Sequence, residues 1–176
     1  MRTTRFITVT ALFTALLICV QLLLSGVGGV ELVTVFFLAF CFCAGIKAGV
    51  TVAVCFSTIR CLLFGFYPTV ILLYLIYYSL FALFFGFLGK KFGKTASLQA
   101  LAAVTVTSTL FTAFFTLLDD VLTPFFYGFG QKATLGYFYA SLPFMLNQCV
   151  CTVISVSLLF IPLARVFKLT VSQNGK

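Results

Sequence analysis

Apolar runs recur along this chain from Phe6 almost to Phe167, separated only by short polar breaks. Apolar residues make up 62% of the 176 residues and charged residues only 8%, so a soluble globule would lack polar surface to cover it. These properties predict an all-α integral membrane protein. Because no long polar segment interrupts the runs, we expect a single transmembrane domain, 1–176, without a separate soluble module.

The runs predict six transmembrane segments packed as a six-helix bundle. The second and third are shorter than the roughly 20 residues that a bilayer requires, so a re-entrant hairpin broken at residues 45–49 is an alternative to two crossings. Either arrangement gives an even number of crossings, which puts both ends of the chain on one side. The six segments are Phe6–Leu24, Leu32–Ala44, Ala48–Phe64, Thr69–Leu88, Leu98–Leu118 and Gly136–Phe167.

The charged residues divide between the two predicted sides. On this topology Arg60, Lys132 and all three acidic residues lie on one side, and the positive-inside rule assigns the other side to the cytoplasm. The net charge of +8 is therefore explained by orientation in a lipid bilayer, and no nucleic-acid partner is implied. The nine basic residues on the predicted cytoplasmic side are Arg2, Arg5, Lys47, Lys90, Lys91, Lys94, Arg165, Lys168 and Lys176.

A stripe of small residues follows one face of the first segment, with spacings of three or four residues. Small side chains let another helix approach closely, and close contact drives helix association in membranes. The stripe predicts either a docking face for a partner, centred on Ala11 and Ala15, or a packing face inside this protein. Its members are Thr4, Thr8, Ala11, Ala15 and Cys19.

A stripe of hydroxyl side chains on the fifth segment leads to two adjacent carboxylates, Asp119 and Asp120. Hydroxyls in a bundle can bond to their own helix, so the stripe alone is compatible with a structural role. Ionised groups beside hydrocarbon are costly and usually face a cavity or a partner. We therefore expect at least one aspartate to line a ligand cavity, with a solvated helix end as the alternative. The hydroxyl stripe comprises Thr105, Ser108, Thr112 and Thr116.

Further candidate binding residues come from the other segments. Glu31 follows a glycine-rich connection that suits either a mobile lid or a tight turn. Arg60, near the outer end of the third segment, should either extend to the interface or pair with Glu31 or an aspartate. Asn147 and Gln148 lie one turn beyond Pro143, and their amides can both donate and accept.

Tyrosines supply a candidate aromatic surface. Tyr74 and Tyr78 share a face of the fourth segment and could stack on a flat ligand, with helix packing as the alternative. Four others, near predicted outer ends, are typical of an interfacial belt. These are Tyr67, Tyr127, Tyr137 and Tyr139.

The sequence offers little for catalysis or metal binding. It has no histidine, and its Cys41/Cys43 and Cys149/Cys151 pairs would point to opposite helix faces. We expect neither a metal site nor another cofactor in this chain. No phosphate-binding loop or nucleophile motif occurs, so we expect no enzyme activity, and any ATP hydrolysis would come from partner subunits.

The order of several short motifs resembles the substrate-binding S component of energy-coupling factor (ECF) transporters, which are prokaryotic importers of vitamins and related micronutrients. The resemblance covers nearly the whole chain, and the order of the motifs supports it more than any single one. The motifs lie at residues 11–15 (ALFTA), 29–34 (GVELVT), 44–49 (AGIKAG), 64–68 (FGFYP), 142–147 (LPFMLN) and 161–163 (IPL).

This resemblance implies a location in a prokaryotic cell membrane and a mechanism. Ala11 and Ala15 would dock on a membrane T component, which is driven by two cytoplasmic ATP-binding subunits. The ligand would be held near the outer surface, and the S component would tip in the membrane to deliver it.

The substrate is left open by the sequence, which carries no recognisable subfamily signature. Three carboxylates and several tyrosines favour a flat nitrogen heterocycle that is rich in donors or positively charged. Two other classes stay open: a structural membrane scaffold of the cell-shape type, and an independent channel or exporter, which would need a continuous polar path.

Overall fold

A computed structural model describes residues 3–24 and 32–172 of the chain. These residues form helices joined by short turns, which confirms the predicted all-α architecture of six segments. The helices are α1 (Thr3–Leu24), α2 (Leu32–Ala44), α3 (Ile46–Phe64), α4 (Pro68–Lys91), α5 (Leu98–Tyr127) and α6 (Gln131–Ser172).

Local sequence signals explain where several helices begin and end. Pro68 occupies the first turn of α4, where its missing N–H group costs no hydrogen bond. Ser97 caps α5 by accepting a hydrogen bond of 3.1 Å from the Ala100 amide. Gly128 ends α5 in the left-handed conformation that glycine adopts readily.

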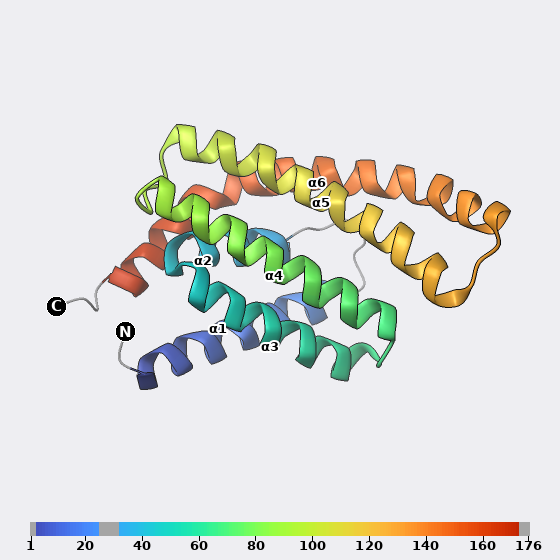
Figure 1. Cartoon of the computed structure of the whole chain (residues 1–176). Coiled ribbons are helices and arrows are strands. Elements are labelled where there is room, and N and C mark those ends of the chain that lie inside the picture. Colours follow the sequence, from blue (N-terminus) through green and yellow to red (C-terminus); the bar gives the residue numbers. More distant parts are fainter. Residues whose placement is uncertain (1–2, 25–31, 173–176) are drawn as a thin grey trace.

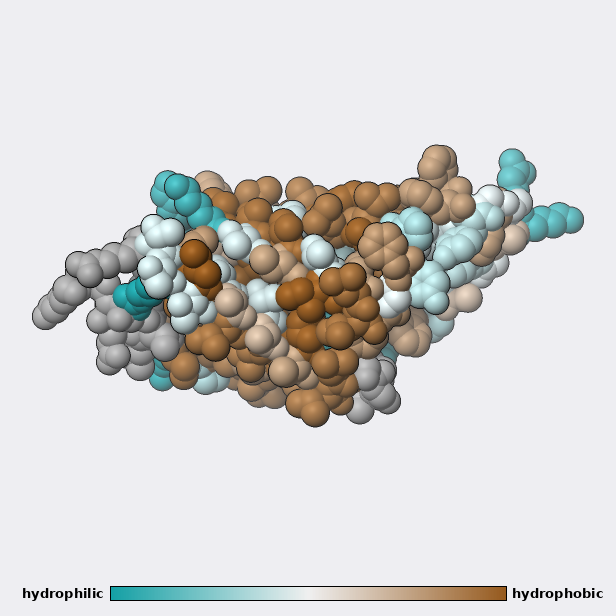
Figure 2. All heavy atoms as spheres, turned by 90° about the horizontal axis from the view of Figure 1, so that it is seen from below, coloured by the Kyte–Doolittle hydropathy of each residue, from teal (hydrophilic) through white to brown (hydrophobic). Residues whose placement is uncertain are grey.

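The helices run back and forth along one long axis (Figure 1). The first turn of α1, the turn between α2 and α3, and the last turns of α6 lie at one end of the bundle. The α5–α6 hairpin extends beyond the α3–α4 turn at the opposite end. Figure 2 shows an apolar surface across the middle of one face, with hydrophilic residues towards both ends.

Five helices are long and apolar enough to cross a membrane, which is consistent with a multi-pass membrane protein. The exception is α2, whose 13 residues span about 20 Å at 1.5 Å per residue, less than a hydrocarbon core of about 30 Å. Conversely, α5 and α6, with 30 and 42 residues, exceed that thickness and continue past the predicted ends of their segments.

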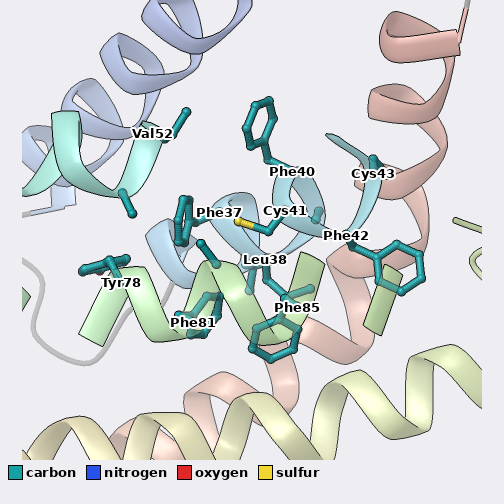
Figure 3. Close-up of a cluster of buried hydrophobic side chains, with 14 of the residues drawn as sticks. Phe37, Leu38, Phe40, Cys41, Phe42, Cys43, Val52, Tyr78, Phe81 and Phe85 are labelled. Atoms are coloured by element: carbon teal, nitrogen blue, oxygen red, sulfur yellow. The ribbon is translucent and has the colours of Figure 1, made fainter. Parts of the chain in front are cut away.

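The short helix α2 forms the centre of the core. Every side chain from Phe37 to Cys43 is at most 2% exposed. Figure 3 shows these side chains reaching towards α3, α4 and α6. The Phe37 ring lies 5.6 Å from that of Phe81 on α4, and Phe42 lies 5.2 Å from Phe160 on α6. A helix that is apolar all round is thus enclosed by the longer helices, as expected for such a sequence.

Two glycines let α4 approach the backbone of its neighbours closely. A Cβ atom at Gly86 would lie 2.8 Å from the Ile46 nitrogen, and one at Gly89 would overlap the Phe42 carbonyl oxygen. The two glycines are three residues apart and therefore share a face of α4. This contact sets the position of the α2–α3 turn against the last turns of α4.

Candidate functional site

The hydroxyl stripe of α5 lies against α6, and two of its four side chains form hydrogen bonds with that helix. Thr112 and Thr152 share a buried hydrogen bond of 3.0 Å between their Oγ1 atoms. One turn later along α5, Thr116 donates to the Gln148 Oε1 atom at 3.3 Å. The stripe is therefore part of a polar interface between two helices, and it leads to the aspartates.

The two aspartates bind hydroxyl groups at the end of this interface nearer the α5–α6 turn. Asp119 accepts hydrogen bonds from Thr123 on its own helix at 2.9 Å and from the Tyr137 hydroxyl of α6 at 2.8 Å. Asp120 is only 5% exposed and accepts a 2.6 Å bond from Ser141, while its Oδ1 atom is buried without a hydrogen-bond partner among the described residues. The neighbouring carboxylates thus differ: Asp120 is enclosed, and Asp119 is accessible.

A cavity of about 300 Å³ lies between α5 and α6 at this position. Aromatic rings of Phe115 and Phe144 contribute apolar surface, and the Asp119 carboxylate and the Gln148 amide contribute polar surface. The remaining lining residues are Thr116, Tyr137, Ala140 and Ser141.

The cavity presents both acceptors and donors to a ligand. Each Asp119 oxygen already accepts one hydrogen bond but has lone pairs for another. Because Gln148 uses Oε1 to accept from Thr116, its NH₂ group keeps the role of donor. Chemically, the arrangement can bind N–H groups at one point and an acceptor at another, beside aromatic rings.

Arg60 packs against one aromatic ring of α3 and one of α4. It makes no ion pair with either described aspartate. Its guanidinium carbon is 3.7 Å from the centroid of the Tyr74 ring and 5.2 Å from that of Phe64. The Nε atom is buried and has no hydrogen-bond partner among the described residues. Tyr74 in turn contacts Phe115, at 5.6 Å between ring centroids, and so connects Arg60 to the wall of the cavity.

The other predicted binding residues are distributed differently. Tyr78 is buried in the core, 5.4 Å from Phe37 and 5.1 Å from Phe56 between ring centroids, rather than lining the cavity. Asn147 is exposed on α6 and does not line the cavity, although Gln148 beside it does. Glu31 lies outside the described residues.

The small-residue stripe of α1 points away from the rest of the protein. Ala11 and Ala15 are exposed, whereas Phe13, Leu17 and Ile18 form the buried face of the helix. The other members of the stripe, Thr4, Thr8 and Cys19, are exposed as well. The alternative in which this stripe packs inside the protein is therefore wrong.

Sequence reasoning found only Gln148 in the α6 half of the site and did not identify Tyr137 or Ser141 as lining residues. The signal was present, because Tyr137, Ser141, Gln148 and Thr152 recur at helical spacings and form a polar face that matches the stripe on α5. Tyr137 was instead assigned to the belt of tyrosines expected at the membrane interface. Nothing in the sequence distinguishes Phe115 and Phe144, which line the cavity, from the rest of the 24 phenylalanines.

Taken together, fold and site define a bundle of membrane-compatible helices with a small amphipathic cavity near one end. The described residues contain no group of three or more Cys, Asp or Glu side chains that could hold a metal ion. No protein-family model, curated protein or solved structure matches this chain.

Proposed function

We propose that this protein is the substrate-capturing subunit of an ECF-type importer, an S component that takes up a vitamin or related micronutrient. The observation that carries this proposal is the cavity between α5 and α6. Its volume of about 300 Å³ falls at the lower end of the roughly 300–1,000 Å³ that is typical of small-molecule sites. Its few polar groups beside aromatic rings are also typical of such sites.

The lining of the cavity favours a nitrogen heterocycle. The accessible Asp119 carboxylate would accept hydrogen bonds from ring N–H or amino groups, or would pair with a positive charge. Gln148 would donate to a ring nitrogen or carbonyl oxygen, and Phe115 and Phe144 would contact the flat faces. A compact heterocycle that has both donors and acceptors on its edge fits this set of groups.

The charge distribution supports an orientation with the cavity facing outward. Lys47, Lys90 and Lys94 lie together at the end of the bundle remote from the α5–α6 turn. The positive-inside rule assigns that end to the cytoplasm, with both ends of the chain on the same side. The cavity would then meet substrates that arrive from outside the cell.

Delivery requires a partner, and the exposed stripe of α1 supports one. Ala11 and Ala15 offer a surface on which another helix could pack closely. In the proposed mechanism this surface docks on a T component, and two cytoplasmic ATP-binding subunits supply the energy. The apolar surface across the middle of the face seen in Figure 2 suits a protein that tips within the bilayer.

An independent channel is less well supported. The hydroxyl stripe was the only candidate for a polar path, and Ser108 and Thr112 are buried within the α5–α6 interface. Thr112 is further tied to Thr152 by a hydrogen bond. Within the described residues, this interface is closely packed and leaves no polar path between the two helices.

Substitutions in the cavity test ligand capture. Asp119→Asn should weaken binding about 10- to 100-fold, because a hydrogen bond to a charged group contributes about 1.5–3 kcal/mol. Gln148→Ala should weaken it about fivefold, as expected for a neutral hydrogen bond of about 1 kcal/mol. The ligand is first found by thermal shift against a panel of heterocyclic vitamins, and its affinity is then measured by calorimetry.

The neighbouring amide provides a matched control. Asn147→Ala removes the same kind of group from an exposed position outside the cavity and should leave the affinity unchanged. Melting without ligand checks that each variant is folded. Equal losses for Asn147→Ala and Gln148→Ala, in folded proteins, would exclude the α5–α6 cavity as the binding site.

A further inference from the structure

A second cavity, of about 690 Å³, lies at the opposite end of the bundle from the candidate site. It is formed where the start of α1, the α2–α3 turn and the end of α4 meet. Three lysines, Lys47, Lys90 and Lys94, line it together with the apolar side chains of Phe6 and Ile46. The cavity therefore combines concentrated positive charge with apolar surface.

Backbone packing fixes the lysines in this position. The contact of Gly86 and Gly89 with the α2–α3 turn brings the last turn of α4, with Lys90, beside Lys47. Lys94 has a φ angle of 57°, in the left-handed region that side chains other than glycine rarely adopt. Its amide donates to the Gly89 carbonyl at 2.8 Å, which turns the chain back over the end of α4.

The positive charge in this cavity is not neutralised by the described part of the protein. Both described aspartates lie on α5 towards the opposite end of the bundle. Within the described residues, the three lysines form no ion pair. Three like charges around one cavity would be stabilised by an anion.

We propose that this cavity binds the headgroup of an anionic phospholipid. The phosphate group would interact with Lys47, Lys90 and Lys94, and the first part of an acyl chain would contact Phe6 and Ile46. Basic pockets between transmembrane helices on the cytoplasmic side are known to bind such headgroups. The apolar lining favours a lipid over a soluble phosphate compound. The site is separate from the proposed substrate cavity and would anchor the basic end of the bundle at the inner leaflet.

Lipid binding to the purified full chain in a nonionic detergent tests the proposal. Dioleoyl phosphatidylglycerol should raise the melting temperature and appear as a retained adduct in native mass spectrometry. Dioleoyl phosphatidylcholine, which has the same acyl chains, should do neither. Lys47→Gln, Lys90→Gln and Lys94→Asn should each weaken phosphatidylglycerol binding about fivefold, as expected for one basic residue near an anionic surface. Asparagine is chosen at position 94 because it tolerates the left-handed backbone.

Lys91 provides the matched control. It lies beside Lys90 in the last turn of α4 and is exposed, but it does not line the cavity. Lys91→Gln removes the same charge from the same end of the protein and should leave the affinity unchanged. Three separate lysines keep the test informative if one variant fails to fold.

Three outcomes would overturn the proposal. Equal losses for Lys91→Gln and Lys90→Gln would mean that lipid responds only to diffuse surface charge. Equal stabilisation by phosphatidylcholine would remove the requirement for an anion. Equal stabilisation by inorganic phosphate at the same concentration would identify a soluble phosphate ligand in place of a lipid.

Discussion

Gly89→Ala should prevent the protein from reaching its native packing. The added methyl group would overlap the backbone carbonyl oxygen of Phe42, at the end of the buried helix α2. Backbone cannot rotate out of the way as a flexible side chain can, so α4 would have to move away from the core. We expect a loss of stability above the roughly 1–3 kcal/mol of ordinary overpacking. Detergent-purified protein should then be aggregated, or should melt at a much lower temperature.

The same substitution elsewhere supplies the control. Gly136 lies within α6, is exposed, and has nothing within 4 Å of the position of an added Cβ atom. Gly136→Ala should leave stability unchanged or raise it by up to about 1 kcal/mol, because alanine favours the helix. A Gly89→Ala protein that melts like Gly136→Ala would contradict the close approach of α4 to α2.

Uptake should be abolished by Ala11→Trp and by Ala15→Trp, while ligand binding is retained. Both alanines are exposed on α1, so a bulky side chain is accommodated in the isolated protein but blocks close packing of a partner helix. Transport is measured in cells that also express the T component and ATP-binding subunits, and binding is measured on the purified variants.

Leu16 provides the comparison for this prediction. It is 40% exposed on the same helix but points about 100° away from Ala15 and about 140° away from Ala11 around the helix axis, so Leu16→Trp should transport normally. Normal transport by the two alanine variants would contradict the docking role of the stripe. Loss of ligand binding in those variants would instead indicate a structural role for this face of α1.

The helices could be predicted from the sequence because an apolar run indicates a helix whether its side chains face lipid or the protein core. The prediction ended the fifth segment at Leu118, whereas α5 continues through Asp119 to Tyr127. Polar residues extend this helix because Asp119 binds Thr123 one turn later and Tyr137 of α6. Such an extension depends on a partner helix, which a search for apolar runs does not detect.

The site could be predicted only in part. The α5 stripe identified Asp119, but adjacent residues such as Asn147 and Gln148 point about 100° apart on a helix, and only packing decides which one faces the cavity. Likewise, Arg60 was expected to extend to the interface or to pair with a carboxylate. Its contact with Tyr74 depends on how α3 packs against α4. These choices arise from tertiary structure, and no local pattern encodes them.

Native mass spectrometry of the detergent-purified protein tests the central claim most directly. We predict that the wild-type protein retains a small heterocyclic metabolite, and that Asp119→Asn, folded but altered in the cavity, retains much less of it. A wild-type protein that carries no metabolite, and that no member of a heterocyclic vitamin panel stabilises against heat, would contradict substrate capture and would favour a structural scaffold.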